Sequence, residues 1–130
     1  MNKLAGRIVF IESSAQMSIV DVKIKGDIFS AVLLDVPGNC LYLKIGQPVE
    51  ILFKETEVSV AKNLSGEISL RNRVRSPVKR VNSQGILTEV VFDYKGADIS
   101  SIISTRSALR LKIKEGEEAE AEAPAQEGKK

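Results

Sequence analysis

Shifting the amino-acid sequence by 70 residues aligns its two halves without a gap. The aligned pairs are apolar residues at strand-like spacing and glycines at turn positions: Leu4 with Val74, Ile8 with Val78, Ile11 with Val81, Val20 with Val90, Val22 with Phe92, Lys25-Gly26 with Lys95-Gly96, and Lys44 and Gly46 with Lys114 and Gly116. Unrelated strands share apolar residues, whereas aligned turn glycines mark backbone positions with a specific conformational demand. The sequence therefore predicts a tandem duplication of a β-rich unit of about 60–70 residues.

The apolar pattern within each unit is typical of short strands. Residues 18–25 alternate, with Val20, Val22 and Ile24 on one face and charged side chains on the other, which indicates a half-buried strand. Further strands are expected at 4–12, 28–34, 49–53 and 58–60, with a helical turn at 40–43. So many short strands in so few residues favour a small barrel. We predict an all-β fold of two tandem, OB-like, five-stranded barrels, each with a short helical turn.

The two repeats differ at their ends. Where the first has residues 49–60, the second has AEAEAPAQEGKK, which is rich in Ala, Glu, Pro and Gly and is typical of disorder. The predicted organisation is a first barrel at 1–62, a second, incomplete barrel at 63–119, and a disordered tail at 120–130. Because an incomplete barrel has an unpaired edge, we expect a homo-oligomer; a barrel that tolerates a missing strand is the alternative.

The composition argues against several classes of function. The net charge is only +2, and with four Phe, two Tyr and no Trp the chain lacks the stacking platforms of single-strand nucleic-acid binders. With no His and no convincing carboxylate pair, no general base stands near a nucleophile. The single Cys40 allows no internal disulfide, and no apolar run approaches the ~18 residues of a membrane span. We expect a cytoplasmic, non-enzymatic protein that contacts neither nucleic acid nor membrane.

Candidate anion ligands gather in the middle of the chain. They are two cations and three hydroxyl or amide side chains: Lys54, Thr56, Ser69, Arg71 and Asn72. A small tetrahedral oxyanion such as molybdate, tungstate, sulfate or phosphate carries only acceptor oxygens, so it needs a dry pocket of N–H and O–H donors with one or two positive charges. The alternative interpretation is that Lys54 and Arg71 are solvated charges at strand ends.

Three short motifs resemble those of the molbindin (Mop) family, also called the transport-associated OB (TOBE) domain. The family's opening S-x-R-N-x-L-x-G is similar to Ser69-Leu70-Arg71-Asn72-Arg73-Val74, and its tail survives as Asn2-Lys3-Leu4-Ala5-Gly6. The central T-N-D-S before L-x-L-K-x-G is similar to Ser104-Thr105-Arg106-Ser107 and Leu111 to Gly116, and the closing K-A-[ST]-x-V to Lys54 to Val58. Ser76 replaces the opening glycine. The resemblance covers residues 2–118.

This resemblance implies a molybdate or tungstate site, with the metal held as its oxyanion and not by direct ligands. The implied ligands are Ser69, Arg71 and Asn72, then Ser104, Thr105 and Ser107, and finally Lys54 and Thr56. Each repeat alone lacks part of this set, because Leu34-Asp35-Val36-Pro37 replaces the hydroxyls in the first and the second lacks the lysine. The resemblance implies a site shared between barrels. Alternatively, Asn72 holds a turn, and Ser104 and Thr105 cap the helical turn.

Two functional hypotheses follow. The first is a cytoplasmic protein that binds molybdate or tungstate for storage, homeostasis or sensing. The second is a non-catalytic TOBE interaction module that regulates a molybdate-type ABC transporter or a regulator without binding the oxyanion itself. A third, an OB-type nucleic-acid binder, is weakened by the near-neutral charge and the few aromatic residues.

Overall fold

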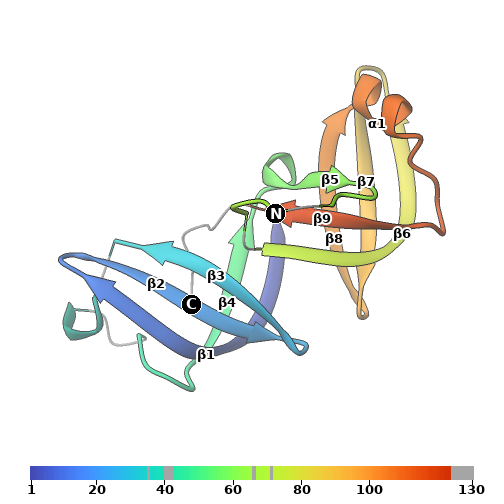
Figure 1. The fold of residues 1–130 in the computed structure, drawn as a ribbon. Coiled ribbons are helices and arrows are strands. Elements are labelled where there is room, and N and C mark those ends of the chain that lie inside the picture. Colours follow the sequence, from blue (N-terminus) through green and yellow to red (C-terminus); the bar gives the residue numbers. More distant parts are fainter. Residues whose placement is uncertain (35, 40–42, 66, 71, 124–130) are drawn as a thin grey trace. The chain divides into compact units, whose positions relative to one another are not determined.

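The computed structural model describes residues 1–130 except 35, 40–42, 66, 71 and 124–130. Among the described residues, the chain forms two compact units. The N-terminal unit comprises residues 3–52, and the C-terminal unit comprises residues 1–2 and 53–123. Figure 1 shows a curled antiparallel sheet in each.

The N-terminal unit contains a four-stranded sheet in the order β3-β2-β1-β4. Its elements are β1 (Asn2–Ser14), β2 (Met17–Ile24), β3 (Asp27–Leu33), the 3-10 turn η1 (Pro37–Asn39) and β4 (Pro48–Phe53). The predicted alternation is confirmed, since Val20, Val22 and Ile24 are buried within β2. The helical turn predicted at residues 40–43 falls mainly on residues outside the described ones.

The C-terminal unit contains a five-stranded sheet in the order β5-β9-β6-β7-β8. Its elements are the 3-10 turn η2 (Glu55–Glu57), β5 (Ser59–Ala61), β6 (Asn72–Gln84), β7 (Leu87–Tyr94), β8 (Ala97–Ser104), helix α1 (Thr105–Leu111) and β9 (Glu118–Ala123). Its core is built around Val78, Val90, Phe92, Tyr94 and Ile99, each no more than 1% exposed.

The duplication predicted from the sequence is confirmed in the backbone. A shift of 70 residues carries β1, β2 and β4 onto β6, β7 and β9 with identical bounds, and carries β3 onto the start of β8. In both sheets the first strand is irregular at the same place, between Ile8 and Phe10 and between Val78 and Arg80. The amides of Gly46 and Gly116 each donate at 2.7 Å to the carbonyl at that point, Ile8 or Val78. Both glycines have φ near +90°, a conformation that favours glycine.

The prediction that the tail is disordered from residue 120 is wrong for residues 120–123, which belong to β9. This strand is the counterpart of β4, so the second repeat does not lack it. Ala119, Ala121 and Ala123 enter the core. Glu120 and Glu122, which lie between them, form ion pairs with Arg73, and Glu118 at the start of the strand forms one with Arg75. Alternation with oppositely charged cross-strand partners stabilises a sequence whose composition resembles a disordered tail.

The short fifth strand predicted at 58–60 is present, but it pairs with the second repeat. In β5, Ser59 lies opposite Glu122 and Ala61 opposite Glu120, so a strand from the first half forms an edge of the C-terminal sheet. Local alternation predicts a strand but not its partner. The segment from Lys54 to Val58, expected to be a closing strand, instead contains the 3-10 turn η2.

None of the described helices is long and apolar enough to cross a membrane.

Candidate functional site

The predicted ligands lie in the C-terminal unit, apart from Arg71, which is outside the described residues. One group, here called the η2 rim, consists of Lys54, Thr56, Ser69 and Asn72. The register places Arg73 opposite Glu122 and Glu122 opposite Ser59, so the start of β6, the end of β9 and the start of β5 lie at the same end of the sheet. Figure 1 shows these three strand ends beside η2. Ser69 lies in an exposed bend just before β6.

Lys54 and Thr56 retain free donors. The turn is held by its own backbone and by Glu57, whose Oε1 accepts from the Lys54 amide at 2.8 Å. Both side chains are exposed, and neither the Lys54 ammonium nor the Thr56 hydroxyl has a hydrogen bond or ion pair with another described residue. An exposed cation beside an unpaired hydroxyl is a suitable start for an anion site.

Other charges near the rim are already paired. Arg73 donates from Nη2 to Glu120 at 3.0 Å and lies 3.5 Å, through Nε, from Glu122 Oε2. The Met1 amino group contacts the Glu55 carboxylate, and this hydrogen bond lowers the pKa of Glu55. Among the described residues of the rim, Lys54 is therefore the cation that remains available to a ligand.

Asn2 occupies, in the first repeat, the position that Asn72 occupies in the second. Its contacts show what an asparagine does there. Its side chain is 5% exposed; Nδ2 donates to the Ser100 carbonyl at 2.9 Å and Oδ1 accepts from the Ser100 amide at 2.7 Å. Because β8 is an edge strand, this amide satisfies backbone groups that would otherwise be unpaired. The role of Asn2 is therefore structural. The alignment of the two repeats is the sequence signal that identifies Asn2, because it pairs Asn2 with the motif residue Asn72.

The second predicted group consists of Ser104, Thr105 and Ser107 at the start of α1. Ser104 Oγ accepts from the Ser107 amide at 3.0 Å and donates to Ser107 Oγ at 3.0 Å. Thr105 Oγ1 donates to the Gly85 carbonyl at 2.8 Å and lies 2.9 Å from Thr88 Oγ1. The alternative interpretation is thus confirmed in part: Ser104 caps the helix, while Thr105 ties the helix to the β6–β7 hairpin.

A hollow of about 560 Å³ lies against this group. It is lined by Gly85, Ile86, Leu87, Ser104, Thr105, Arg106 and Leu109. The repeat counterpart in the N-terminal unit, about 490 Å³, is lined by Ser14, Ala15, Gln16, Met17 and Leu34, with no charged residue among the lining residues that the structure describes. Arg106 therefore makes the hollow beside α1 the more suitable of the two for an anion.

The two groups are attached to different points of β8. Ser101 Oγ donates to the Val58 carbonyl, which places the residue after η2 beside the middle of β8. Ser104 ends β8 three residues further along, about 10 Å from Ser101 at ordinary strand rise.

The arrangement of two tandem OB-type sheets places the chain in a fold class, the tandem small-barrel proteins. No protein-family model and no curated protein matches the chain. Its structure is similar to that of the cytoplasmic molybdate-binding protein ModG, in a PEG-grown form with molybdate bound, with a TM-score of 0.89 and 24% sequence identity over 98% of this chain and 92% of that chain. This likeness shows a shared fold across both repeats.

Proposed function

We propose that this protein binds molybdate or tungstate as an intact oxyanion and acts in the cytoplasm in storage, homeostasis or sensing. The observation that carries the proposal is the similarity, over 98% of the chain, to a molybdate-binding protein whose crystals contain molybdate. The free Lys54 and Thr56 side chains at the η2 rim support it. Nothing in this proposal requires a catalytic step.

The physical task of the site is to replace water around a dianion. Desolvation costs several kcal/mol, and each charge-assisted hydrogen bond offsets about 1.5–3 kcal/mol. In the proposed site, Lys54 and Arg71 supply positive charge, and Thr56 and Ser69 supply neutral donors. Asn72 is 5% exposed and already interacts within the protein. Arg106 and Ser107, in the first turn of α1, offer further donors. The hydroxyls of Ser104 and Thr105 already bond other groups of the protein.

We propose that a second copy completes each site, because η2 and α1 are attached to different points of β8. The α1 group of one copy would then face the η2 rim of another. Light scattering should give a mass that is a multiple of the 14.2 kDa chain. A monomer that still binds molybdate tightly would contradict the shared site.

A second candidate function is a non-catalytic module that acts on a molybdate-type transporter or a regulator without holding the oxyanion. One observation favours it. The polar groups of Asn2, Ser104 and Thr105 all bond the protein itself. Direct titration separates the two candidates.

Isothermal titration with molybdate is expected to give a Kd in the micromolar range or tighter, which corresponds to about −8 kcal/mol. Sulfate and phosphate serve as competitors, and tungstate as the second test ligand. If neither metal oxyanion releases heat or raises the melting temperature, the interaction-module function replaces the proposal.

Lys54→Ala and Arg71→Ala are each expected to weaken molybdate binding at least about tenfold, because each removes a charge-assisted donor. Arg75→Ala is the matched control, since its pair with Glu118 is exposed, with 65% and 55% of the two side chains accessible. Arg73→Ala is unsuitable as a control because it would leave two neighbouring carboxylates unpaired. Equal losses in Lys54→Ala, Arg71→Ala and Arg75→Ala would indicate bulk charge and not a site.

A further inference from the structure

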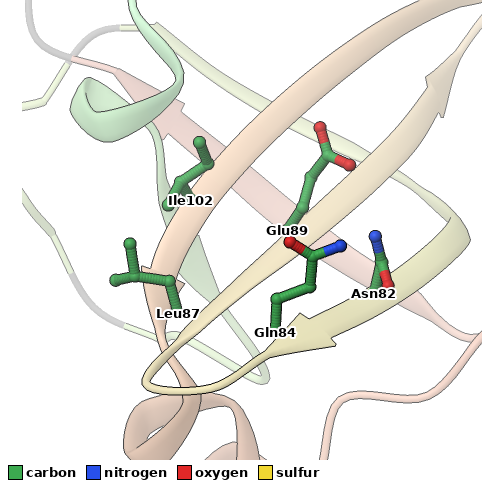
Figure 2. Close-up of a pocket in the computed structure, with 5 residues that line it drawn as sticks. All are labelled: Asn82, Gln84, Leu87, Glu89 and Ile102. Carbon is green, nitrogen blue, oxygen red and sulfur yellow. The ribbon is translucent and has the colours of Figure 1, made fainter.

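A separate hollow of about 240 Å³ lies on the face of the β6–β7–β8 sheet that points away from the core of the C-terminal unit (Figure 2). It is lined by Asn82, Gln84, Leu87, Glu89 and Ile102. The register places Asn82 opposite Glu89, Gln84 opposite Leu87, and Glu89 opposite Ile102, so these side chains share one face. Thr88 and Val90, which flank Glu89 along β7, are completely buried on the other face.

The hollow has one apolar side and one polar side. Figure 2 shows Leu87 and Ile102 together on one side, and Asn82, Gln84 and Glu89 on the other. None of these three polar side chains has a hydrogen bond or ion pair with another described residue. Glu89 is half-buried, and no lysine or arginine is among the lining residues within the described part of the chain.

We propose that this hollow binds an arginine side chain presented by a partner protein. The guanidinium carries only donors, arranged in a planar fork, and the hollow offers the Glu89 carboxylate and the side-chain carbonyls of Asn82 and Gln84 as acceptors. The aliphatic part of the arginine packs on Leu87 and Ile102. A volume of about 240 Å³ is below the range of about 300–1,000 Å³ typical of small-molecule sites, which suits a single side chain.

The first repeat provides an internal comparison. At the equivalent positions it has Glu12 for Asn82, Ser14 for Gln84 and Ile19 for Glu89. The combination of one carboxylate with two side-chain amides is therefore specific to the second repeat. Of the described lining residues, Leu87 also lines the hollow beside α1.

The test uses the full chain with N-acetyl-arginine methylamide as the probe, followed by NMR. We expect weak, about millimolar, binding with shifts at the Leu87 and Ile102 methyl groups and the Glu89 amide. Glu89→Gln is expected to weaken binding about tenfold, because the charge-assisted bond is lost. The neutral citrulline analogue is expected to bind at least about tenfold more weakly for the same reason.

Glu50→Gln, which removes an exposed carboxylate on β4, is the control and should leave arginine binding unchanged. Equal binding of the citrulline analogue, equal loss in Glu50→Gln, or shifts located elsewhere would each overturn the proposal. Molybdate titration of Glu89→Gln should match that of the unmodified chain. The arginine site and the oxyanion site are therefore tested separately, so failure of one proposal does not contradict the other.

Discussion

Ending the chain at Glu117 is expected to unfold the C-terminal unit, although the sequence composition alone predicts that the last residues are dispensable. The truncation removes β9, which lies between β5 and β6 in the sheet and pairs with both. It also exposes the core that Ala119, Ala121 and Ala123 cover, at 3%, 4% and 6% exposure. Each lost hydrogen bond costs about 0.5–1.5 kcal/mol, so the sum approaches the whole stability of a small domain.

Circular dichroism and NMR of the truncated chain provide the measurement. The matched control ends at Ala123 and keeps β9 intact, and it should retain the NMR signals of the C-terminal unit. Two point substitutions test the same strand more finely. Ala121→Asp places a charge in the core, whereas Glu118→Ala removes a largely exposed side chain. If the chain ending at Glu117 melts like the full chain, β9 is not part of the folded unit.

The outcome for β9 illustrates which parts of the fold a sequence can predict. The repeat, the alternating strands and the turn glycines are local signals, and the structure confirms them. The glutamates of β9 form ion pairs with arginines 43 and 47 residues away, and composition does not reveal such distant partners. Alanine also provides little apolar signal, so residues 118–123 resemble a tail rather than a strand.

Sequence motifs predict only part of the candidate site, because, as with β9, the partners of some side chains are distant in the sequence. Motif matching finds Lys54 and Thr56, which have free donors in the structure. It does not distinguish a ligand hydroxyl from one already bonded, and Ser104 and Thr105 bond backbone groups of α1 and the β6–β7 hairpin. The hydrogen bonds of these side chains depend on tertiary contacts that the motif does not contain.

Glu122 is expected to make the C-terminal unit less stable as the pH rises from mildly acidic toward neutral. The side chain is only 5% exposed, and its Oε2 atom has no hydrogen-bond partner. It shares Arg73 with Glu120, so two carboxylates face one guanidinium. Burial, and then the hydrogen bond and charge of Glu120, raise the pKa of Glu122 above the ordinary value of 4.5.

The sign of the effect follows from proton linkage. Because the folded state holds this proton more tightly than the unfolded state, the stabilisation is present below pH 4.5 and is lost as the pH rises through the raised pKa. Glu120 acts oppositely: burial favours a higher pKa, but hydrogen bonds from Glu122 and Arg73 outweigh it and lower the pKa. Its stabilisation is therefore lost only as the pH falls below 4.5.

Glu122→Gln isolates the Glu122 effect, because glutamine keeps the shape and a donor but does not titrate. With no histidine in the chain, few other side chains titrate between about pH 5 and 8. Hydrogen exchange of the Val90 and Phe92 amides, measured in steps from about pH 5 to 8 and corrected for intrinsic exchange, reports the stability of this core. The free-energy difference between the variant and the unmodified chain should grow with pH to about 1–3 kcal/mol, the cost of an unmatched buried acceptor.

Glu118→Gln, at an exposed pair, should leave the pH profile unchanged. Parallel profiles for the unmodified chain and Glu122→Gln would show that Glu122 is already ionised across this range.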